Sequence, residues 1–241
     1  MKLLIRVIIS SLILGITSWV IIQLPSVQDR ILVAAFSALG SGSNNLPKED
    51  ALSAAVCGSR SPLPSPGRAE TCILISAGED LFVVDIGDGS NDNLRNWNIN
   101  FRNIEAVLIT HLHSDHISDL PGLHQNAWVV GERSSKLKVF GPEGVDQFTQ
   151  GIERAYAHDY VFRNEHHGDA IAPLEYAGFD TSVIDLNNPV IFDNGELKIT
   201  AFRVVHEPIE PALGFKFEYK GDKVMNATNI ITDIRPIKTI K

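Results

Sequence analysis

The stretch THLHSDH, residues 110–116, places three imidazoles and one carboxylate within six positions. Imidazole nitrogen and carboxylate oxygen are the atoms through which proteins bind zinc and similar ions. His111 and His113 are two residues apart, so on an extended segment their side chains point the same way and can bind one ion. Asp115 and His116 are adjacent and need a turn to face one side, where they can bind a second ion. This spacing predicts a metal centre and disfavours an accidental histidine-rich surface loop.

Two neighbouring metal ions can bind a water molecule and deprotonate it at neutral pH. The resulting hydroxide attacks esters, amides or phosphodiesters. The stretch therefore predicts a metal-dependent hydrolase with zinc as its cofactor. Manganese and iron stay open as alternatives, because sites built from histidine and aspartate accept all three metals.

Further ligands must come from elsewhere in the chain. His206 ends the apolar stretch ITAFRVVH, just as His111 follows AVLIT, and we predict that it is a further metal ligand. Asp85 closes the stretch LFVVD, and spacing leaves two roles open: it holds a ligand imidazole by its other nitrogen, or it caps the turn before Gly87. The other histidines have weaker contexts and are expected at the surface or in a cleft, the last three of them beside the substrate: His124, His158, His166 and His167.

Hydrophobic patterning indicates which elements position these side chains. Apolar or alternating runs predict strands at residues 51–57, 71–78, 81–89, 103–110, 136–141, 196–206 and 214–221. Residues 58–70 are rich in proline and are expected to form a loop, as are the polar residues 157–180. Helices are expected over residues 120–132 and after the turn at Pro142 and Glu143. Strands grouped with occasional helices predict an α/β sandwich.

Composition sets limits on the class of protein. Hydrophobic residues make up 44% and charged residues 21% of 241 residues, which indicates a globular chain. The formal net charge of -8 argues against a nucleic-acid partner, because phosphate binding requires clustered Lys and Arg. Cys57 and Cys72 form neither a disulfide framework nor a CxxC zinc site. We favour two small buried residues, and a single disulfide is the alternative if the compartment is oxidising.

The N-terminus bears on the compartment. Lys2 and Arg6 precede a mostly apolar run from Val7 to Leu24, and this run of about 18 residues is near the minimum that spans a bilayer. We expect residues 1–25 to be a transmembrane anchor or, as the alternative, a signal peptide, with the positive residues in the cytoplasm. Residues 26–50 are expected to be a flexible tether, followed by one domain at 51–241. The predicted location is the periplasmic side of the inner membrane, anchored, or the periplasm after secretion.

Three stretches resemble a known family. THLHSDHISDLPG resembles the His-x-His-x-Asp-His signature of the metallo-β-lactamase fold hydrolases. CGSRSPLPSPGRAETCILISAGEDLFVVDIGDG resembles the opening strands of that superfamily, with its Asp-x-Gly turn at Asp85 and Gly87. FRVVHEPIEPALGFKFEYKGDKV is similar to the segment that carries the third histidine in the ribonuclease Z-like branch, and KVFGPEG before a helix fits the arylsulfatase-type subgroup of that branch. The resemblance covers roughly residues 52–225.

The resemblance implies an αββα sandwich with the metal ions at one edge, between two sheets. It also implies a ligand set in two parts, the first ion bound by His111, His113 and His206 and the second by Asp115 and His116. Asp115 would in addition be the catalytic residue that orients or deprotonates the water. Asp85 would support a ligand histidine from behind.

The end of the chain departs from the family pattern. The resemblance implies a later strand ending in Ser-Gly-Asp, whose aspartate bridges the two ions, and a further histidine. Here Asn229 stands about where that aspartate is expected, Asp233 lies nearby, and no histidine follows His206. We therefore expect a member truncated at the C-terminus, with an incomplete second half and an incomplete second metal site.

Several functions are compatible with these features. The first is a zinc hydrolase acting on a small-molecule ester, namely a sulfate ester, a phosphodiester or a lactone, without a nucleic-acid partner. The alternative is a catalytically impaired metal-binding protein, because ligands are missing. A tRNA 3′-processing endonuclease ranks lower, since the chain is acidic and has no Lys/Gly-rich arm, and a β-lactamase is a further candidate from the fold alone. The oligomeric state stays open, a dimer included.

Overall fold

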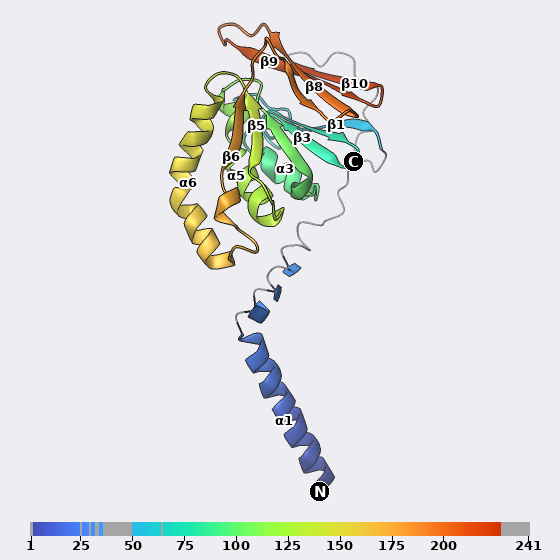
Figure 1. The fold of residues 1–241 in the computed structure, drawn as a ribbon, viewed down its shortest axis with the longest axis vertical. Coiled ribbons are helices and arrows are strands. Elements are labelled where there is room, and N and C mark those ends of the chain that lie inside the picture. The colour runs from blue at the N-terminus through green and yellow to red at the C-terminus, as the bar shows by residue number, and fades with distance from the viewer. Residues whose placement is uncertain are drawn as a thin grey trace.

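The computed structural model describes residues 2–24, 26–28, 30–31, 34–35, 50–63 and 65–227. Two β-sheets form the body of the protein, and helices cover one of them (Figure 1). The predicted tether at 26–50 lies for the most part outside the described residues, and Asn229 and Asp233 lie wholly outside them.

The first sheet has six strands in the order β1-β2-β3-β4-β5-β6. Their bounds are Leu52–Gly58 (β1), Cys72–Ala77 (β2), Asp80–Val84 (β3), Ile104–Leu108 (β4), Leu137–Gly141 (β5) and Phe179–Val183 (β6). Strands β1 to β3 pair antiparallel, whereas β3 to β6 pair parallel. The carboxyl ends of the four parallel strands therefore meet at one edge of the sheet.

The second sheet has four antiparallel strands in the order β10-β9-β8-β7. Their bounds are Val190–Asp193 (β7), Leu197–Val204 (β8), Ala212–Tyr219 (β9) and Asp222–Ala227 (β10). The two alternating runs of the sequence, 196–206 and 214–221, correspond to β8 and β9. The loop between them carries His206.

The strands β2, β3 and β4 of the first sheet are buried on both faces, which explains their largely apolar sequences. In β3, Leu81 and Val83 belong to the core on the helical side, whereas Phe82 and Val84 belong to the core between the sheets. The ring of Phe82 lies 5.9 Å from the ring of Phe217 on β9. The helical layer contains α3 (Ser90–Asn96), α4 (Ser114–Ile117), α5 (Leu120–Gln125) and α6 (Val145–His167). These layers confirm the predicted α/β sandwich, and within the described residues no helix covers the outer face of the second sheet.

The prediction of a loop over residues 157–180 is wrong at both ends. Helix α6 continues to His167, and residues 179–183 form β6, which pairs with β5. The helix is long because one face is buried at regular spacing, through Val145, Thr149, Ile152 and Tyr160. The polar residues that indicated a loop form the solvent face of this helix.

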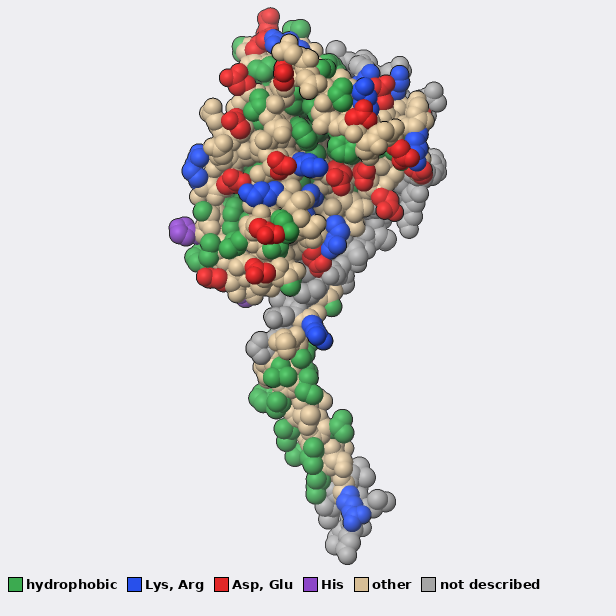
Figure 2. All heavy atoms as spheres, viewed as in Figure 1, with side chains coloured by type: hydrophobic (Ala, Val, Ile, Leu, Met, Phe, Trp, Pro, Cys, Tyr) green, Lys and Arg blue, Asp and Glu red, His purple; other side chains and the backbone are tan. Residues whose placement is uncertain are grey.

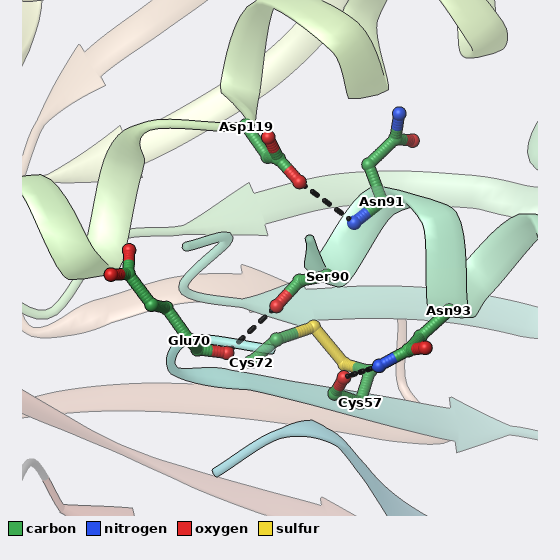
Figure 3. The surroundings of a disulfide bond; sticks show 7 residues. All are labelled: Cys57, Glu70, Cys72, Ser90, Asn91, Asn93 and Asp119. Carbon is green, nitrogen blue, oxygen red and sulfur yellow. Dashed lines mark hydrogen bonds between the residues drawn. A yellow bond between two sulfur atoms is a disulfide. The ribbon is translucent and has the colours of Figure 1, made fainter. Parts of the chain in front are cut away.

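A disulfide joins Cys57 on β1 to Cys72 on β2, across a sequence separation of 15 residues. Both cysteines are also buried. The structure therefore shows the disulfide that the sequence left as the alternative, and also the burial that the sequence favoured. Figure 3 shows the polar contacts around the bond, where the Asn93 side chain donates to the Cys57 carbonyl at 2.7 Å and the Ser90 hydroxyl donates to the Glu70 carbonyl at 2.7 Å. The disulfide therefore connects the outer strands of the first sheet beside the start of α3.

Helix α1 spans Lys2–Ile22, where the sequence predicted an anchor or signal segment. Apolar side chains such as Leu12, Leu14 and Trp19 are exposed along it (Figure 2). In the part of the chain that the structure describes, no helix reaches the length and apolarity needed to cross a membrane.

Candidate metal centre

The candidate ligands lie at the carboxyl edge of the parallel strands. β3 and β4 pair with Val84 opposite Leu108, so the residues that follow the two strands emerge side by side. Asp85 follows β3, and residues 109–113 follow β4. The backbone N–H of Leu213 in β9 donates to the Thr110 carbonyl at 2.9 Å, which connects the second sheet to this loop. Such an edge is where open α/β sheets bind ligands.

Three histidines converge at this edge. The candidate ligand atoms of His111, His113 and His206 all lie within 4.8 Å of one another. His111 Nε2 is 3.0 Å from His113 Nδ1, and the ring centroids of His111 and His206 are 4.8 Å apart. His111 is fully buried, whereas His113 is exposed. The cluster therefore has one histidine anchored in the core and one that faces solvent.

Asp115 and His116 form a second, adjoining pair on the short helix α4. The ring of His116 lies 4.0 Å from the ring of His111, and His116 Nε2 is 3.7 Å from Asp115 Oδ2. Both side chains are buried, and Asp115 Oδ1 has no hydrogen-bond partner among the described residues. An unsatisfied buried carboxylate oxygen is costly unless a donor or a cation reaches it.

The turn after β3 packs directly against α4. The Ile86 N–H donates to the His116 carbonyl at 2.8 Å. A Cβ at Gly87 would lie 2.1 Å from the Asp115 carbonyl oxygen, so no other residue fits there without moving the helix. The Asp-x-Gly turn therefore fixes the position of the second pair.

Asp85 lies behind the histidines and is 2% exposed. Its Oδ1 accepts the Thr110 N–H at 2.8 Å, and its Oδ2 accepts the Thr110 hydroxyl at 2.8 Å. Its Oδ2 is also 2.7 Å from His116 Nδ1. Of the two roles left open by the sequence, this geometry corresponds to holding a histidine by the nitrogen that points away from the metal position.

Burial and charge shift the pKa values of two neighbouring imidazoles, His111 and His116, in opposite directions. Burial, followed by the positive fields of His116, His113 and His206, lowers the pKa of His111 to about 3. Burial also acts to lower the pKa of His116, but the hydrogen bond and charge of Asp85 outweigh it and raise that pKa. His111 is therefore neutral at pH 7 and can offer a lone pair to a cation.

The donor set fits a divalent metal ion. Two nitrogens bound to one tetrahedral ion at about 2.1 Å lie roughly 3.4 Å apart, which is near the 3.0 Å between His111 Nε2 and His113 Nδ1. The buried, unpaired Asp115 Oδ1 offers a carboxylate oxygen beside them. Three imidazoles and an adjacent carboxylate are a typical ligand set for such ions.

The remaining histidines lie elsewhere. His124 was expected at the surface or in a cleft, but it is 1% exposed and accepts the Gly178 N–H at Nε2, at 2.8 Å. The expectation fails because α5 turns this side chain into a core cluster with Trp128 and Tyr160. The three proposed substrate-side residues, His158, His166 and His167, all lie on α6 and do not join the three-histidine cluster.

Sequence reasoning missed Thr110, which contacts both Asp85 and the histidines. Its hydroxyl lies 3.1 Å from His111 Nδ1 and 3.4 Å from His116 Nδ1. The one sequence signal was its place directly before His111, at the end of a buried strand.

The fold and the cluster agree with a family model. The model of the Metallo-beta-lactamase superfamily matches residues 65–225, and the chain belongs to this superfamily. The predicted resemblance is thereby confirmed for most of the domain.

Among curated proteins, the chain is similar to ribonuclease Z. It is 30% identical over 176 residues to the ribonuclease Z of Mycobacterium marinum, covering 72% of this chain and 61% of that protein. The ribonuclease Z of Mycobacterium bovis is 30% identical over the same length and with the same coverage. The chain therefore spans 61% of the length of these relatives.

Solved structures share the fold at lower identity. Human tRNase Z, short form, has a TM-score of 0.54 and 22% identity, covering 76% of this chain and 70% of that one. A metallo-β-lactamase fold protein from Bacillus subtilis has a TM-score of 0.52 and 19% identity, covering 72% of this chain and 61% of that one. At these identities the likeness concerns the fold alone.

The relatives overturn one prediction. A small-molecule ester was expected as the substrate and nucleic acid was disfavoured, but the similar curated proteins are ribonucleases by name. The prediction relied on the net charge of -8, and bulk charge does not report the local field at a site rich in histidines. Acidic and basic side chains are interspersed over the face that Figure 2 shows.

Proposed function

We propose that this chain forms the metal-binding part of a zinc-dependent hydrolase that cleaves phosphodiester bonds in RNA. The observation that carries the proposal is the convergence of His111, His113 and His206 beside Asp115 and His116. The 30% identity to ribonuclease Z over 176 residues supports RNA as the substrate class.

Each residue of the centre has a role that its position supports. His111, His113 and His206 would hold one ion, and Asp115 and His116 would face a second. When bound there, zinc supplies Lewis-acid polarisation of a phosphoryl oxygen and a lowered pKa for water.

Asp115 and His113 contribute in different ways. The Oδ1 atom of Asp115 is buried and has no protein partner within the described chain, so it can accept a hydrogen bond from the attacking water and orient it. His113 is exposed, so the scissile phosphodiester can approach the centre from its side. The buried His111 anchors the centre to the core.

A cleavage assay with the full-length chain tests the proposal. The zinc-loaded protein is incubated with an end-labelled tRNA precursor that carries a 3′ extension, beside His113→Ala. His158→Ala is the matched control, since His158 is an exposed histidine on α6, outside the cluster. We expect His113→Ala to reduce cleavage more than about 100-fold, because losing a ligand exceeds the effect of losing its supporting residues.

His158→Ala should cleave like the unchanged protein. Cleavage no faster than that of His113→Ala would refute the hydrolase. Equal cleavage of a DNA strand of the same sequence would refute RNA as the preferred substrate.

A second candidate is a metal-binding protein without turnover. It is favoured by the ligand count, since within the described residues the three-histidine cluster is the only group of three or more metal-binding side chains. Elemental analysis of the purified chain separates the candidates. Two zinc ions per chain, lost in His111→Ala, support the hydrolase, whereas a single ion without RNA cleavage supports the second candidate.

We also propose that the domain folds in an oxidising compartment, the periplasm or its equivalent. The buried Cys57–Cys72 bond supports this, because structural disulfides persist in such compartments and are rare in the cytosol. The location confines the proposed activity to RNA that reaches that compartment. Alkylation of free thiols in intact cells, followed by mass spectrometry, tests it: modified cysteines would contradict the proposal.

A further inference from the structure

Thr110 lies where the two halves of the metal centre meet. Its hydroxyl oxygen is 2.8 Å from Asp85 Oδ2, 3.1 Å from His111 Nδ1 and 3.4 Å from His116 Nδ1. Thr110, Asp85 and His111 are each at most 2% exposed, so water does not compete for these contacts from bulk solvent. A hydroxyl has one proton to donate, which constrains where every proton in this group must lie.

The proton count can be completed from the acceptors. An ionised carboxylate only accepts hydrogen bonds, so Asp85 Oδ2 accepts one from the Thr110 hydroxyl and another from His116 Nδ1, which is 2.7 Å away. The hydroxyl proton is then used. His111 Nδ1 must therefore be the donor in its 3.1 Å contact with the Thr110 oxygen. Both imidazoles therefore carry a proton on Nδ1, and His111 presents a lone pair at Nε2.

We propose that Thr110 is a positioning residue that extends the hydrogen-bonding reach of Asp85 to His111, so that one buried carboxylate orients an imidazole in each half of the metal centre. His116 contacts the carboxylate directly, and His111 contacts it through the Thr110 hydroxyl. The backbone of Thr110 secures the arrangement, because its N–H donates to Asp85 Oδ1 and its carbonyl accepts from Leu213 on the second sheet.

Removal of the hydroxyl should release His111 selectively. Thr110→Val keeps the shape of the side chain but leaves His111 Nδ1 without an acceptor. The ring can then place its proton on Nε2, the atom that lies 3.0 Å from His113 Nδ1 within the cluster. Thr110→Ser keeps the hydroxyl and is the matched control.

The first measurement is the tautomer of His111 in the metal-free, full-length chain labelled with ¹⁵N-histidine, by long-range ¹H–¹⁵N correlation spectra. We expect the proton on Nδ1 in the unchanged chain and in Thr110→Ser, and a substantial Nε2-protonated population in Thr110→Val. A proton on Nε2 of His111 in the unchanged chain would overturn the proposal, whether or not the variants fold.

The second measurement is zinc affinity, by competition with a chromophoric chelator. Loss of a group that supports a metal ligand weakens binding 10–100-fold as a rule, so we expect Thr110→Val to bind zinc roughly 10–100-fold more weakly and Thr110→Ser to bind normally. Equal affinity of Thr110→Val and the unchanged chain would overturn the proposal, as would a serine variant as weak as the valine variant.

The affinity effect rests on the metal site of the proposed function, and the tautomer does not. If the chain binds no zinc while His111 still carries its proton on Nδ1, the proposed function fails and the role of Thr110 stands.

Discussion

Acidification should destabilise this protein through His124, a histidine outside the metal centre. His124 is 1% exposed and packs against Trp128, Tyr160 and Phe179. Its Nε2 accepts the Gly178 N–H at 2.8 Å, so its proton is on Nδ1, which has no hydrogen-bond partner among the described residues. A second proton would place a charge in an apolar cluster and remove the acceptor for Gly178.

The size and sign of the effect follow from the pKa of His124. Burial is the main cause that lowers this pKa from 6.5 to about 4; Arg133 and Lys136 lower it further, and Asp159 opposes them. Below pH 6.5 the unfolded chain binds a proton at His124 that the folded chain does not. The free energy of unfolding therefore decreases as the pH is lowered from 6.5, and it stops decreasing below about pH 4. One pKa unit is worth about 1.4 kcal/mol, and the total loss is therefore about 3 kcal/mol.

Urea unfolding followed by tryptophan fluorescence, with chelator present, measures this loss between pH 7 and 4.5. His124→Gln is the control, because its side-chain oxygen can accept the Gly178 N–H but does not titrate. The free energy of unfolding should fall more steeply with acid in the unchanged chain than in His124→Gln. Parallel pH profiles for the two proteins would refute the reasoning.

Three further predictions concern the disulfide, the glycines at Gly87 and Gly151, and zinc binding. Cys57→Ala with Cys72→Ala should lower the free energy of unfolding by about 3 kcal/mol, the value for a loop of about 15 residues, and dithiothreitol should abolish the difference in urea unfolding. Gly87→Ala would place a Cβ 2.1 Å from the Asp115 carbonyl oxygen, so it should lower both stability and zinc occupancy by elemental analysis; Gly151→Ala, with nothing within 4 Å of its Cβ, should stabilise α6 by about 0.5–1 kcal/mol. Zinc at 100 times its dissociation constant should stabilise the folded chain by about 2.7 kcal/mol, and His111→Ala should lose this shift in thermal unfolding.

The sequence predicts the parts of the site that depend on short spacing. His111 and His113 are two residues apart on an extended segment, and the structure places their nitrogens 3.0 Å apart. His206 is 93 residues beyond His113 by numbering, and only its place at the end of an apolar strand and the family resemblance of that segment pointed to the centre. Short-range geometry is a property of the segment itself, and the pairing of distant strand ends is a property of the fold.

Other features depend on tertiary contacts that leave little trace in the sequence. The role of Thr110 requires Asp85, which is 25 positions away and becomes its neighbour only because β3 and β4 run parallel. Residues 157–167 read as a polar loop because the buried face of α6 shows in that stretch mainly through Tyr160. The disulfide stayed open because it requires the antiparallel pairing of β1 with β2.

The metal centre depends on the packing of two sheets as much as on its motif. His111 and His113 follow a strand of the first sheet, whereas His206 follows a strand of the second. The sheets are held together by an apolar core between them and, at the site itself, by the hydrogen bond from the Leu213 N–H to the Thr110 carbonyl. Thr110 thus joins the second sheet through its backbone and the histidines through its hydroxyl. Thr110 therefore contributes to the geometry of the cluster through His111, although its own side chain is not a ligand.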